Sequence, residues 1–293
     1  MCRHLLILGC GYVGTRLAQA CLQRGFRVSG SSRSDTHARH LSQMHIEGVV
    51  ADQPAKLADD LLASVTHLVD SIPLSMRDSG LVASQADWLP RLTERCSQLR
   101  WAAYLSSTGV YGDAAGAWVN EDSMCQPDSQ RGQQRLIAEA AWLNSGLPAE
   151  VFRLAGIYGP ERNIINKLQA GDYKAVQWQP PHASSRIHVD DIVTTLLAAI
   201  EKPRPGRILN VADDLPLPHA DYVQEVAALI GAPAPLILTP AEGEQYLSAA
   251  ALSFFRDNKR IDNHRLKHEL GISLKYPTFR HAFEKVESSL MSV

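Results

Sequence analysis

Three glycines near the start of the chain have the spacing of a loop that binds a dinucleotide. The pattern GxGxxG follows the apolar run Leu5–Leu8 and opens an amphipathic stretch, so it joins a predicted strand to a predicted helix. The first glycine permits a tight turn, the second lets the backbone approach a pyrophosphate, and the third lets helix pack on strand. Unpaired N–H groups at the helix start favour the phosphates. The predicted cofactor residues of this loop are Gly9, Gly11, Tyr12, Val13 and Gly14.

The end of the second predicted strand indicates which dinucleotide binds. Enzymes that use NAD usually carry Asp or Glu there, where the carboxylate holds the 2′-hydroxyl of the ribose. Here the strand is followed by Ser31, Ser32 and Arg33. A guanidinium beside hydroxyl groups suits a 2′-phosphate, so Ser32 and Arg33 predict NADP. NAD stays open, because Asp35 would serve the ribose if the strand runs further.

The elements that must position these residues alternate along the first half of the chain. Short apolar runs predict strands at Leu5–Leu8, Arg27–Gly30, Gly48–Ala51, His67–Val69, Trp101–Leu105 and Ala149–Arg153. Amphipathic stretches between them predict helices that include Gly14–Gln23, Leu57–Ala63, Ala83–Gln98 and Gly132–Asn144. This alternation predicts a Rossmann-type α/β fold with a doubly wound parallel sheet. Ligands of such folds bind beyond the carboxyl ends of the strands.

The second half of the chain is less regular. Prolines interrupt it near residues 180, 203–205 and 216–218, and two helices stand out at Val189–Glu201 and His219–Ile230. We expect an NAD(P)-binding domain over residues 1–155 and a small C-terminal substrate lobe over residues 156–293, partly interleaved with the first.

The composition excludes several other classes of protein. The 293 residues carry 29 Lys and Arg against 31 Asp and Glu, which excludes a strongly basic nucleic-acid binder. No apolar run approaches the roughly 18–20 residues of a membrane helix, and the apolar stretch at the start is too short for a signal peptide. The five cysteines show no CxxC pair or regular spacing. They predict reduced thiols in a cytoplasmic protein and no metal site.

Several further segments resemble extended or atypical short-chain dehydrogenases/reductases, of the NAD-dependent epimerase/dehydratase type that acts on nucleoside-diphosphate sugars. The resemblance covers nearly the whole chain. The matching segments are the glycine loop, His67–Ser71, Leu105–Gly112, Arg153–Pro160, Arg186–Asp191 and Leu209–Ala212. By this resemblance, Asp52 after the third strand contacts the adenine. Asp190 and Asp191 are interpreted as a structural helix start, where carboxylates suit the helix dipole.

The resemblance also implies a catalytic set of Ser, Tyr and Lys, and the chain departs from it. Ser107 falls at the position of the family serine, which orients the reacting hydroxyl or carbonyl. The YxxxK helix should follow about 25 residues later, but Arg131 stands at the tyrosine position and Arg135 at the lysine position. None of the eight tyrosines has Lys four residues later. Arginine cannot replace a phenol as general acid or base.

Other roles are therefore assigned to these positions. Arg135 would hold ribose hydroxyls of the cofactor, and Arg131 would hold an anionic group of the substrate. Tyr111 and Tyr158 end strands on the ligand side, and either one could supply the proton that the missing tyrosine would donate.

The predicted substrate site departs from the family pattern at one position. Members that bind sugar nucleotides usually carry Asn three residues after the strand arginine, where it touches the substrate pyrophosphate. Here that position is Gly156. An anionic substrate is still compatible with the chain, and its predicted contacts are Arg153, Tyr158, Arg162, Asn163 and Arg186.

These observations predict an atypical short-chain NAD(P)-dependent oxidoreductase or epimerase-like enzyme that acts on an unidentified hydroxyl or carbonyl substrate. The alternative is a non-catalytic NAD(P)(H)-binding redox sensor or scaffold, which the loss of the proton relay favours. The partner is a small molecule, with no nucleic acid or membrane. The resemblance implies a homodimer through Ala83–Gln98 and Gly132–Asn144.

Overall fold

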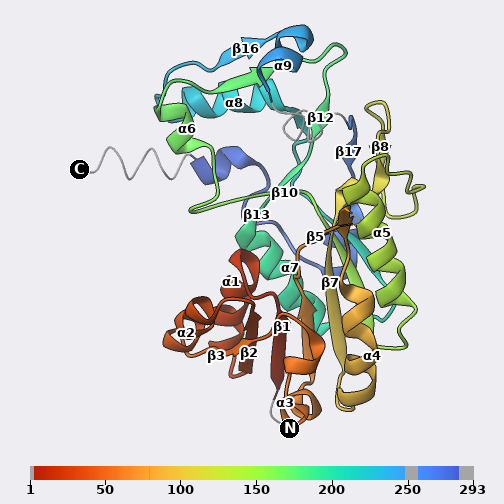
Figure 1. Ribbon diagram of the computed structural model, residues 1–293. Coiled ribbons are helices and arrows are strands. Elements are labelled where there is room, and N and C mark those ends of the chain that lie inside the picture. Colours follow the sequence, from red (N-terminus) through yellow and green to blue (C-terminus); the bar gives the residue numbers. More distant parts are fainter. Residues whose placement is uncertain (1–2, 79, 248–256, 284–293) are drawn as a thin grey trace. The chain divides into compact units, whose positions relative to one another are not determined.

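The computed structural model describes residues 3–78, 80–247 and 257–283 (Figure 1). The chain divides into two compact units. The first combines Met1–Val110, Gln130–Arg153 and Ile192–Leu209, and the second combines Tyr111–Ser129, Leu154–Asp191 and Asn210–Val293. The predicted domains, 1–155 and a partly interleaved lobe of 156–293, differ from this division in their bounds. The chain returns to the first unit after residue 191, because most of helix α7 (Val189–Glu201) belongs to it.

The first unit is built on a seven-stranded sheet with the order β14-β9-β7-β4-β1-β2-β3. The strand pairs β1–β2, β1–β4, β2–β3 and β4–β7 are parallel. This arrangement confirms the predicted Rossmann-type doubly wound fold. The sheet strands are β1 (His4–Leu8), β2 (Arg27–Ser32), β3 (Glu47–Val50), β4 (His67–Asp70), β7 (Trp101–Ser107), β9 (Ala149–Leu154) and β14 (Ile208–Val211).

Alternate residues of β1 face opposite layers of helices. Leu6 and Leu8 belong to the core formed with helices α3, α4 and α5, whereas Ile7 packs against Gly14 of α1. Because both faces are covered, the strand is fully buried and reads as a continuous apolar run. The helices of this unit, besides α7, are α1 (Tyr12–Leu22), α2 (Asp35–Gln43), α3 (Asp59–Ser64), α4 (Gln85–Arg95) and α5 (Gln130–Leu143).

Helix α2 was not predicted, because it is mostly polar. Only Ala38 and Leu41 are buried in it, so its apolar stripe is too narrow to stand out. The Ser34 hydroxyl caps it by accepting from the His37 N–H. The short elements of this unit are η1 (Pro54–Lys56), the antiparallel pair β5 (Ser75–Arg77) and β6 (Gly80–Val82), and η2 (Thr108–Tyr111), which ends at the start of the second unit.

The second unit has a core of its own around helix α8. Tyr158, Leu168, Tyr222, Val223 and Phe279 are buried in it. Its helices are α6 (Ile165–Gln169), α8 (His219–Leu229), α9 (Pro240–Tyr246) and α11 (His264–Leu270). Its strands are β8 (Trp118–Val119), β10 (Gly156–Tyr158), β11 (Lys174–Val176), β12 (Ala183–Ser184), β13 (Arg186–His188), β15 (Leu217–Pro218), β16 (Leu236–Leu238) and β17 (Arg260–Ile261).

The described part of the chain contains neither a membrane-spanning helix nor a group of side chains that could hold a metal ion. Within it, no helix combines the length and the apolar character that a membrane span requires. The same residues contain no group of three or more His, Cys, Asp or Glu side chains that could hold a metal ion.

Candidate functional site

The glycine loop lies between β1 and α1, and each of its glycines meets a different constraint. Gly9 has φ +71°, and a Cβ there would lie 3.1 Å from backbone atoms of Ile72. A Cβ on Gly14 would lie 3.0 Å from Ile7 Cγ2, so this glycine lets α1 approach the sheet. At Gly11 a Cβ would meet only the Gly9 oxygen, at 3.9 Å. The exposed backbone of Gly11 therefore faces open space, as a pyrophosphate requires.

Neighbouring strands hold this loop in place. The Gly9 N–H donates to Ser31 Oγ at 3.0 Å, and the Cys10 N–H donates to the Ser31 carbonyl at 2.8 Å. His37 Nε2 lies 2.8 Å from the Cys10 carbonyl. Tyr12 and Val13 begin helix α1, so they follow the turn directly. The loop is thus fixed by its own sheet before any ligand binds, and its shape fits a dinucleotide.

The turn after β2 presents the residues predicted to recognise the ribose. Strand β2 ends at Ser32, and Asp35 is the first residue of α2, so the strand does not extend to Asp35. The Asp35 carboxylate forms an ion pair with Arg39 one helical turn later. Arg33 is exposed. Ser32 Oγ accepts from the Ser34 N–H at 3.1 Å, which leaves its hydroxyl hydrogen for donation.

Asp52 lies just after β3, at the same edge of the parallel sheet as the turn after β2. Its carboxylate forms an exposed ion pair of 2.9 Å with Lys56. The hydrogen bond from Lys56 holds the pKa of Asp52 below its usual value, and the charge of Arg33 contributes in the same direction. Asp52 is therefore an anion within the electrostatic reach of Arg33.

Ser107 ends strand β7 and is half-buried. Its Oγ accepts from the Gly109 N–H at 3.1 Å, so the hydroxyl hydrogen can point to a ligand oxygen. Arg131 lies in the first turn of α5 and is exposed. Within the described chain, no hydrogen bond or ion pair engages the Arg131 guanidinium.

Arg135 lies one turn further along α5 and is bound to strand β7. Its Nη1 donates to the Tyr104 hydroxyl at 2.9 Å and to the Leu105 carbonyl at 3.3 Å. Burial raises the pKa of Tyr104, while the nearby charge of Arg135 lowers it in part. Tyr104 is completely buried, so this pair is an internal contact and Tyr104 cannot reach a substrate.

Arg153 takes a different partner from the predicted anionic ligand. Its guanidinium forms a buried ion pair with Glu139, with Nη2 at 2.8 Å from Oε2. Ser106 Oγ donates to the same carboxylate at 2.6 Å. The two charged side chains are only 4% and 2% exposed. Arg153 therefore joins β9 to α5 and is not available to a substrate.

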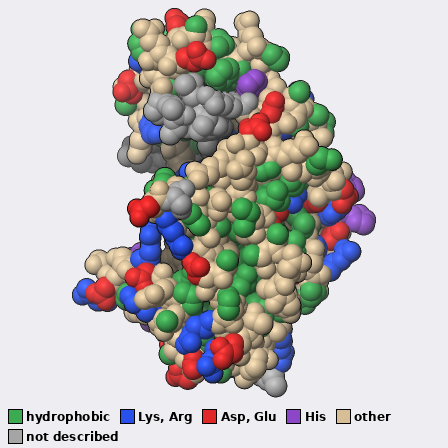
Figure 2. Space-filling model, turned by 45° about the vertical axis from the view of Figure 1, so that its right-hand side comes forward, with side chains coloured by type: hydrophobic (Ala, Val, Ile, Leu, Met, Phe, Trp, Pro, Cys, Tyr) green, Lys and Arg blue, Asp and Glu red, His purple; other side chains and the backbone are tan. Residues whose placement is uncertain are grey.

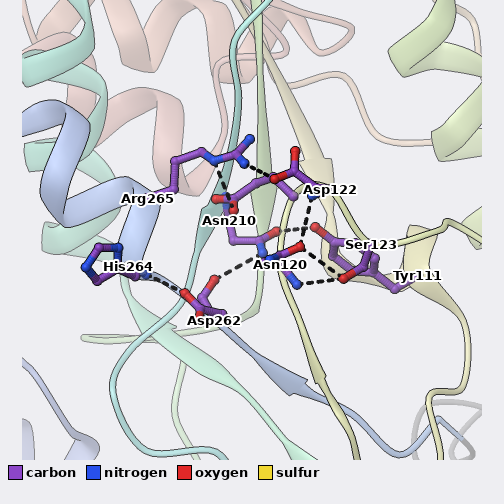
Figure 3. Close-up of polar contacts among 9 residues, drawn as sticks. Tyr111, Asn120, Asp122, Ser123, Asn210, Asp262, His264 and Arg265 are labelled. Atoms are coloured by element: carbon purple, nitrogen blue, oxygen red, sulfur yellow. Dashed lines mark hydrogen bonds and ion pairs between the residues drawn. The ribbon is translucent and has the colours of Figure 1, made fainter.

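Tyr111 is likewise engaged, within the second unit (Figure 3). Its hydroxyl donates to Asn210 Oδ1 at 2.7 Å, and the residue is 2% exposed. The Asn210 N–H donates to the buried Glu121 carboxylate, and Asn210 Nδ2 donates to the Asp262 carbonyl. This network gives the phenol a structural role in place of the predicted role in catalysis.

Arg162 and Asn163 lie in the turn after β10 and are exposed. Backbone bonds between Gly159 and Arg162 close the turn. Asn163 Nδ2 donates to the Gly159 carbonyl, and its Oδ1 accepts from the Ile165 N–H at 3.0 Å. Asn163 therefore shapes the turn, with its amide already engaged on both sides.

Arg186 is buried in the second unit. Its guanidinium donates to Ser184 and to the Leu217 carbonyl, and it lies 3.8 Å from the centre of the Tyr222 ring. Tyr158 lies on the neighbouring strand, two positions on in the register of β10 and β13. The structure thus brings Arg186 and Tyr158 close to each other, and their contact with a substrate stays a prediction.

Comparison with known proteins identifies the family. The model of the NAD dependent epimerase/dehydratase family matches residues 5–212. The chain belongs to this family. A conserved protein of unknown function from Silicibacter pomeroyi is 35% identical, with a TM-score of 0.87 and coverage of 98% of this chain and 99% of that one. Protein YeeZ of Escherichia coli is 26% identical over 94% of this chain and 97% of its own length.

A more distant neighbour shares the fold alone. The human epimerase family protein SDR39U1, solved with NADPH, has a TM-score of 0.76 at 16% identity and covers 97% of this chain and 99% of that chain. The departures from the family pattern that the resemblance implies, at Arg131, Arg135 and Gly156, stay predictions.

The sequence does not predict two buried polar contacts of the structure. Tyr104, three residues before Ser107, was read only as an apolar strand residue, although a phenol in a buried strand needs a hydrogen-bond partner. Asp213 was not singled out, although it follows the quoted Leu209–Ala212 segment. Its carboxyl lies in the Arg186 cluster, within the electrostatic reach of that guanidinium.

Proposed function

We propose that this chain is an NAD(P)-dependent oxidoreductase or epimerase-like enzyme with non-standard catalytic residues, acting on an anionic hydroxyl or carbonyl substrate. The observation that carries the proposal is the glycine loop. Its first and third glycines are packed, and the backbone of Gly11 faces open space. Membership in the epimerase/dehydratase family supports the same conclusion.

NADP is the proposed cofactor, with NAD as the alternative. Strand β2 ends at Ser32, and Arg33 follows it as an exposed cation, which suits a 2′-phosphate. Asp35, the residue that would favour NAD, is paired with Arg39. The neighbour SDR39U1 was solved with NADPH, whereas MoeE5 was solved with NAD, so similar folds accept either cofactor.

The chemistry divides between the cofactor and this chain. A bound nicotinamide would supply hydride transfer. Ser107 would donate a hydrogen bond to the reacting oxygen and orient it. Arg131 is an exposed cation at the tyrosine position, so it would hold an anionic group and could not move a proton. Arg135 would contact the cofactor through the donors that Tyr104 and Leu105 leave unused.

One observation favours a second function. Both positions of the proton relay are arginines, and Arg135 is bound to a buried phenol and a backbone carbonyl. A protein that binds NAD(P)(H) without turnover, as a redox sensor or scaffold, would tolerate this loss. The retained Ser107 favours the enzyme.

The first test is a fluorescence titration with NADPH and NADH side by side. NADPH binding at least tenfold tighter than NADH supports the cofactor assignment, and reversed preference assigns NAD. No binding of either would refute the proposed function. NADPH consumption across a panel of carbonyl compounds then separates an enzyme from a sensor. Gain of activity in the double variant Arg131→Tyr and Arg135→Lys would show that only the relay was lost.

We further propose a homodimer formed through α4 and α5. A groove of about 430 Å³ between these helices is lined by Ala86, Leu89, Pro90, Thr93, Glu94, Ala141 and Ser145. Ile137 on α5 is 56% exposed. Figure 2, in which this side comes forward, shows hydrophobic side chains gathered over it. A second copy of the chain fits an apolar helical face of this kind.

The proposed location is the cytoplasm. No disulfide joins Cys10, Cys21, Cys96 and Cys125, the four cysteines within the described residues. Burial raises the pKa of Cys10 and Cys96 to about 11, so these thiols are unreactive. Thiols of this kind suit a reducing compartment.

A further inference from the structure

Two buried polar atoms without a hydrogen-bond partner lie in one cluster of the second unit. Among the described residues, nothing forms a hydrogen bond with Tyr158 Oη or Asp213 Oδ2, and these two residues are 5% and 1% exposed. Both lie within the electrostatic reach of Arg186. Buried polar atoms in folded proteins are nearly always hydrogen-bonded, so an orphaned pair indicates a missing water, ion or ligand.

Within the described chain, the Arg186 guanidinium in this cluster also lacks a carboxylate as its partner. Arg186 is 7% exposed, and its hydrogen bonds go to Ser184 and to the Leu217 carbonyl, all of them neutral oxygens. No carboxylate lies within ion-pair distance of it among the described residues. A buried charge is strongly destabilising without a counter-charge, so this cation calls for an anion.

The surroundings limit which anion fits. Gly156 lies opposite Arg186 in the strand register, and a Cβ on it would already lie 3.3 Å from the Ser185 carbonyl and 3.9 Å from Arg186 Cγ. A side chain at position 156 would therefore press against the strand that carries Arg186. The carboxyl groups of Asp191 and Asp214 are close enough to raise the pKa of Asp213. These carboxyl groups would repel a diphosphate, which carries two or more charges, more strongly than a single carboxylate.

We propose that Arg186, Tyr158 and Asp213 form a binding site for a single carboxylate group of the substrate. The guanidinium supplies the counter-charge, and the Tyr158 hydroxyl donates a hydrogen bond. Asp213, when protonated, donates a second one through Oδ2. The inference deepens the proposed function and rests on it, since it names the anionic group of that substrate.

The protonation of Asp213 supports this arrangement. Burial raises its pKa to about 8, so the carboxyl is neutral at pH 7 and can donate. Above pH 8 it becomes an anion, which offsets the charge of Arg186 and repels a second carboxylate. The groups that face it are Arg186 on β13, Tyr158 on β10, Tyr222 on α8, Asp191 on α7 and the adjacent Asp214.

The test uses thermal unfolding of the whole chain without cofactor, with formate and acetate as probes. Formamide and acetamide are the matched neutral controls, and chloride keeps the ionic strength constant. We expect the carboxylates alone to raise Tm, with a dissociation constant that is flat below pH 8 and rises above it. Arg186→Gln should weaken binding at least tenfold. Asp213→Asn should abolish the pH dependence while binding persists.

Tyr158→Phe separates a ligand site from a structural contact. Because its hydroxyl has no partner, the variant should keep the Tm of the ligand-free chain but lose several-fold in carboxylate affinity. Tyr111→Phe is the matched control, since its hydroxyl is bonded to Asn210 and its removal should lower Tm without changing carboxylate affinity. If Arg186→Gln fails to fold, the carboxylate affinity of Tyr158→Phe still tests the site.

Three outcomes would overturn the carboxylate site. Inorganic phosphate or UDP could bind through Arg186 in place of the carboxylates, which would assign a phosphate site. The carboxylates could raise Tm equally in every variant. Finally, Arg186→Gln could leave the binding of both carboxylates and phosphates unchanged. That result would assign an internal water to Tyr158 Oη and Asp213 Oδ2. The dinucleotide titration is separate, so loss of cofactor binding with an intact carboxylate response would refute the proposed function alone.

Discussion

The Arg135 guanidinium donates a 2.9 Å hydrogen bond to the hydroxyl of Tyr104, 31 residues earlier in the chain. The arginine at the family lysine position is therefore tied to strand β7. This contact holds α5 against the sheet and fixes which guanidinium donors remain for a cofactor.

Tyr104→Phe should release part of this constraint. The variant should lose about 1 kcal/mol of unfolding free energy, because one buried hydrogen bond is removed. The NADPH dissociation constant should change by several-fold, since Arg135 becomes more mobile. Urea denaturation and fluorescence titration measure the two effects. Tyr111→Phe is the control: it should lose stability with unchanged NADPH affinity, and the same affinity change in both variants would contradict the assignment.

The glycine loop gives a pair of opposite predictions. Gly11→Ala should leave the unfolding free energy nearly unchanged, because its Cβ would meet no atom closer than 3.9 Å. It should weaken dinucleotide binding at least tenfold, since the methyl group occupies the space of the pyrophosphate. Gly14→Ala should cost about 1–3 kcal/mol, because it crowds Ile7. Unchanged NADPH affinity in Gly11→Ala would place the phosphates elsewhere.

Arg33→Ala tests cofactor selection. NADPH affinity should fall at least tenfold, while NADH affinity should change by less than twofold, because only NADPH carries the 2′-phosphate. Arg39→Ala is the matched control, since this arginine lies on α2 and is paired with Asp35. Equal losses for both cofactors would show that Arg33 does not read the phosphate. Raising the salt concentration should reduce the NADPH advantage in the unmodified chain.

Ile137→Asp tests the proposed dimer. A carboxylate at the exposed face of α5 should raise the dimer dissociation constant at least tenfold, because a charge is then buried against an apolar partner. Sedimentation velocity at micromolar concentration measures the change. Leu236→Asp on β16 removes an equally exposed apolar side chain from the other unit and should have no effect. A monomer in the unmodified chain would refute the dimer.

Much of the fold could be predicted from local patterns. The observed strands β1, β2, β3, β4, β7 and β9 overlap the predicted ranges, with ends that differ by at most two residues. Helix α7 has the predicted bounds Val189–Glu201. The sequence predicts these elements because a buried parallel strand is a continuous apolar run and an amphipathic helix has apolar residues at regular spacing. The polar helix α2 leaves none, and it was missed.

The sequence by itself determined the glycine loop and the family, and it predicts that Arg131 and Arg135 stand at the tyrosine and lysine positions. Each of these depends on short motifs whose residues are close together in the chain. Only the tertiary structure decided which polar side chains are already engaged. Arg153 is paired with Glu139, Arg135 with Tyr104, and Tyr111 with Asn210, which is 99 residues away. The sequence does not distinguish an arginine that pairs with an internal carboxylate from one that binds a ligand, because the side chain is the same. Only the packing of the folded chain assigns its partner.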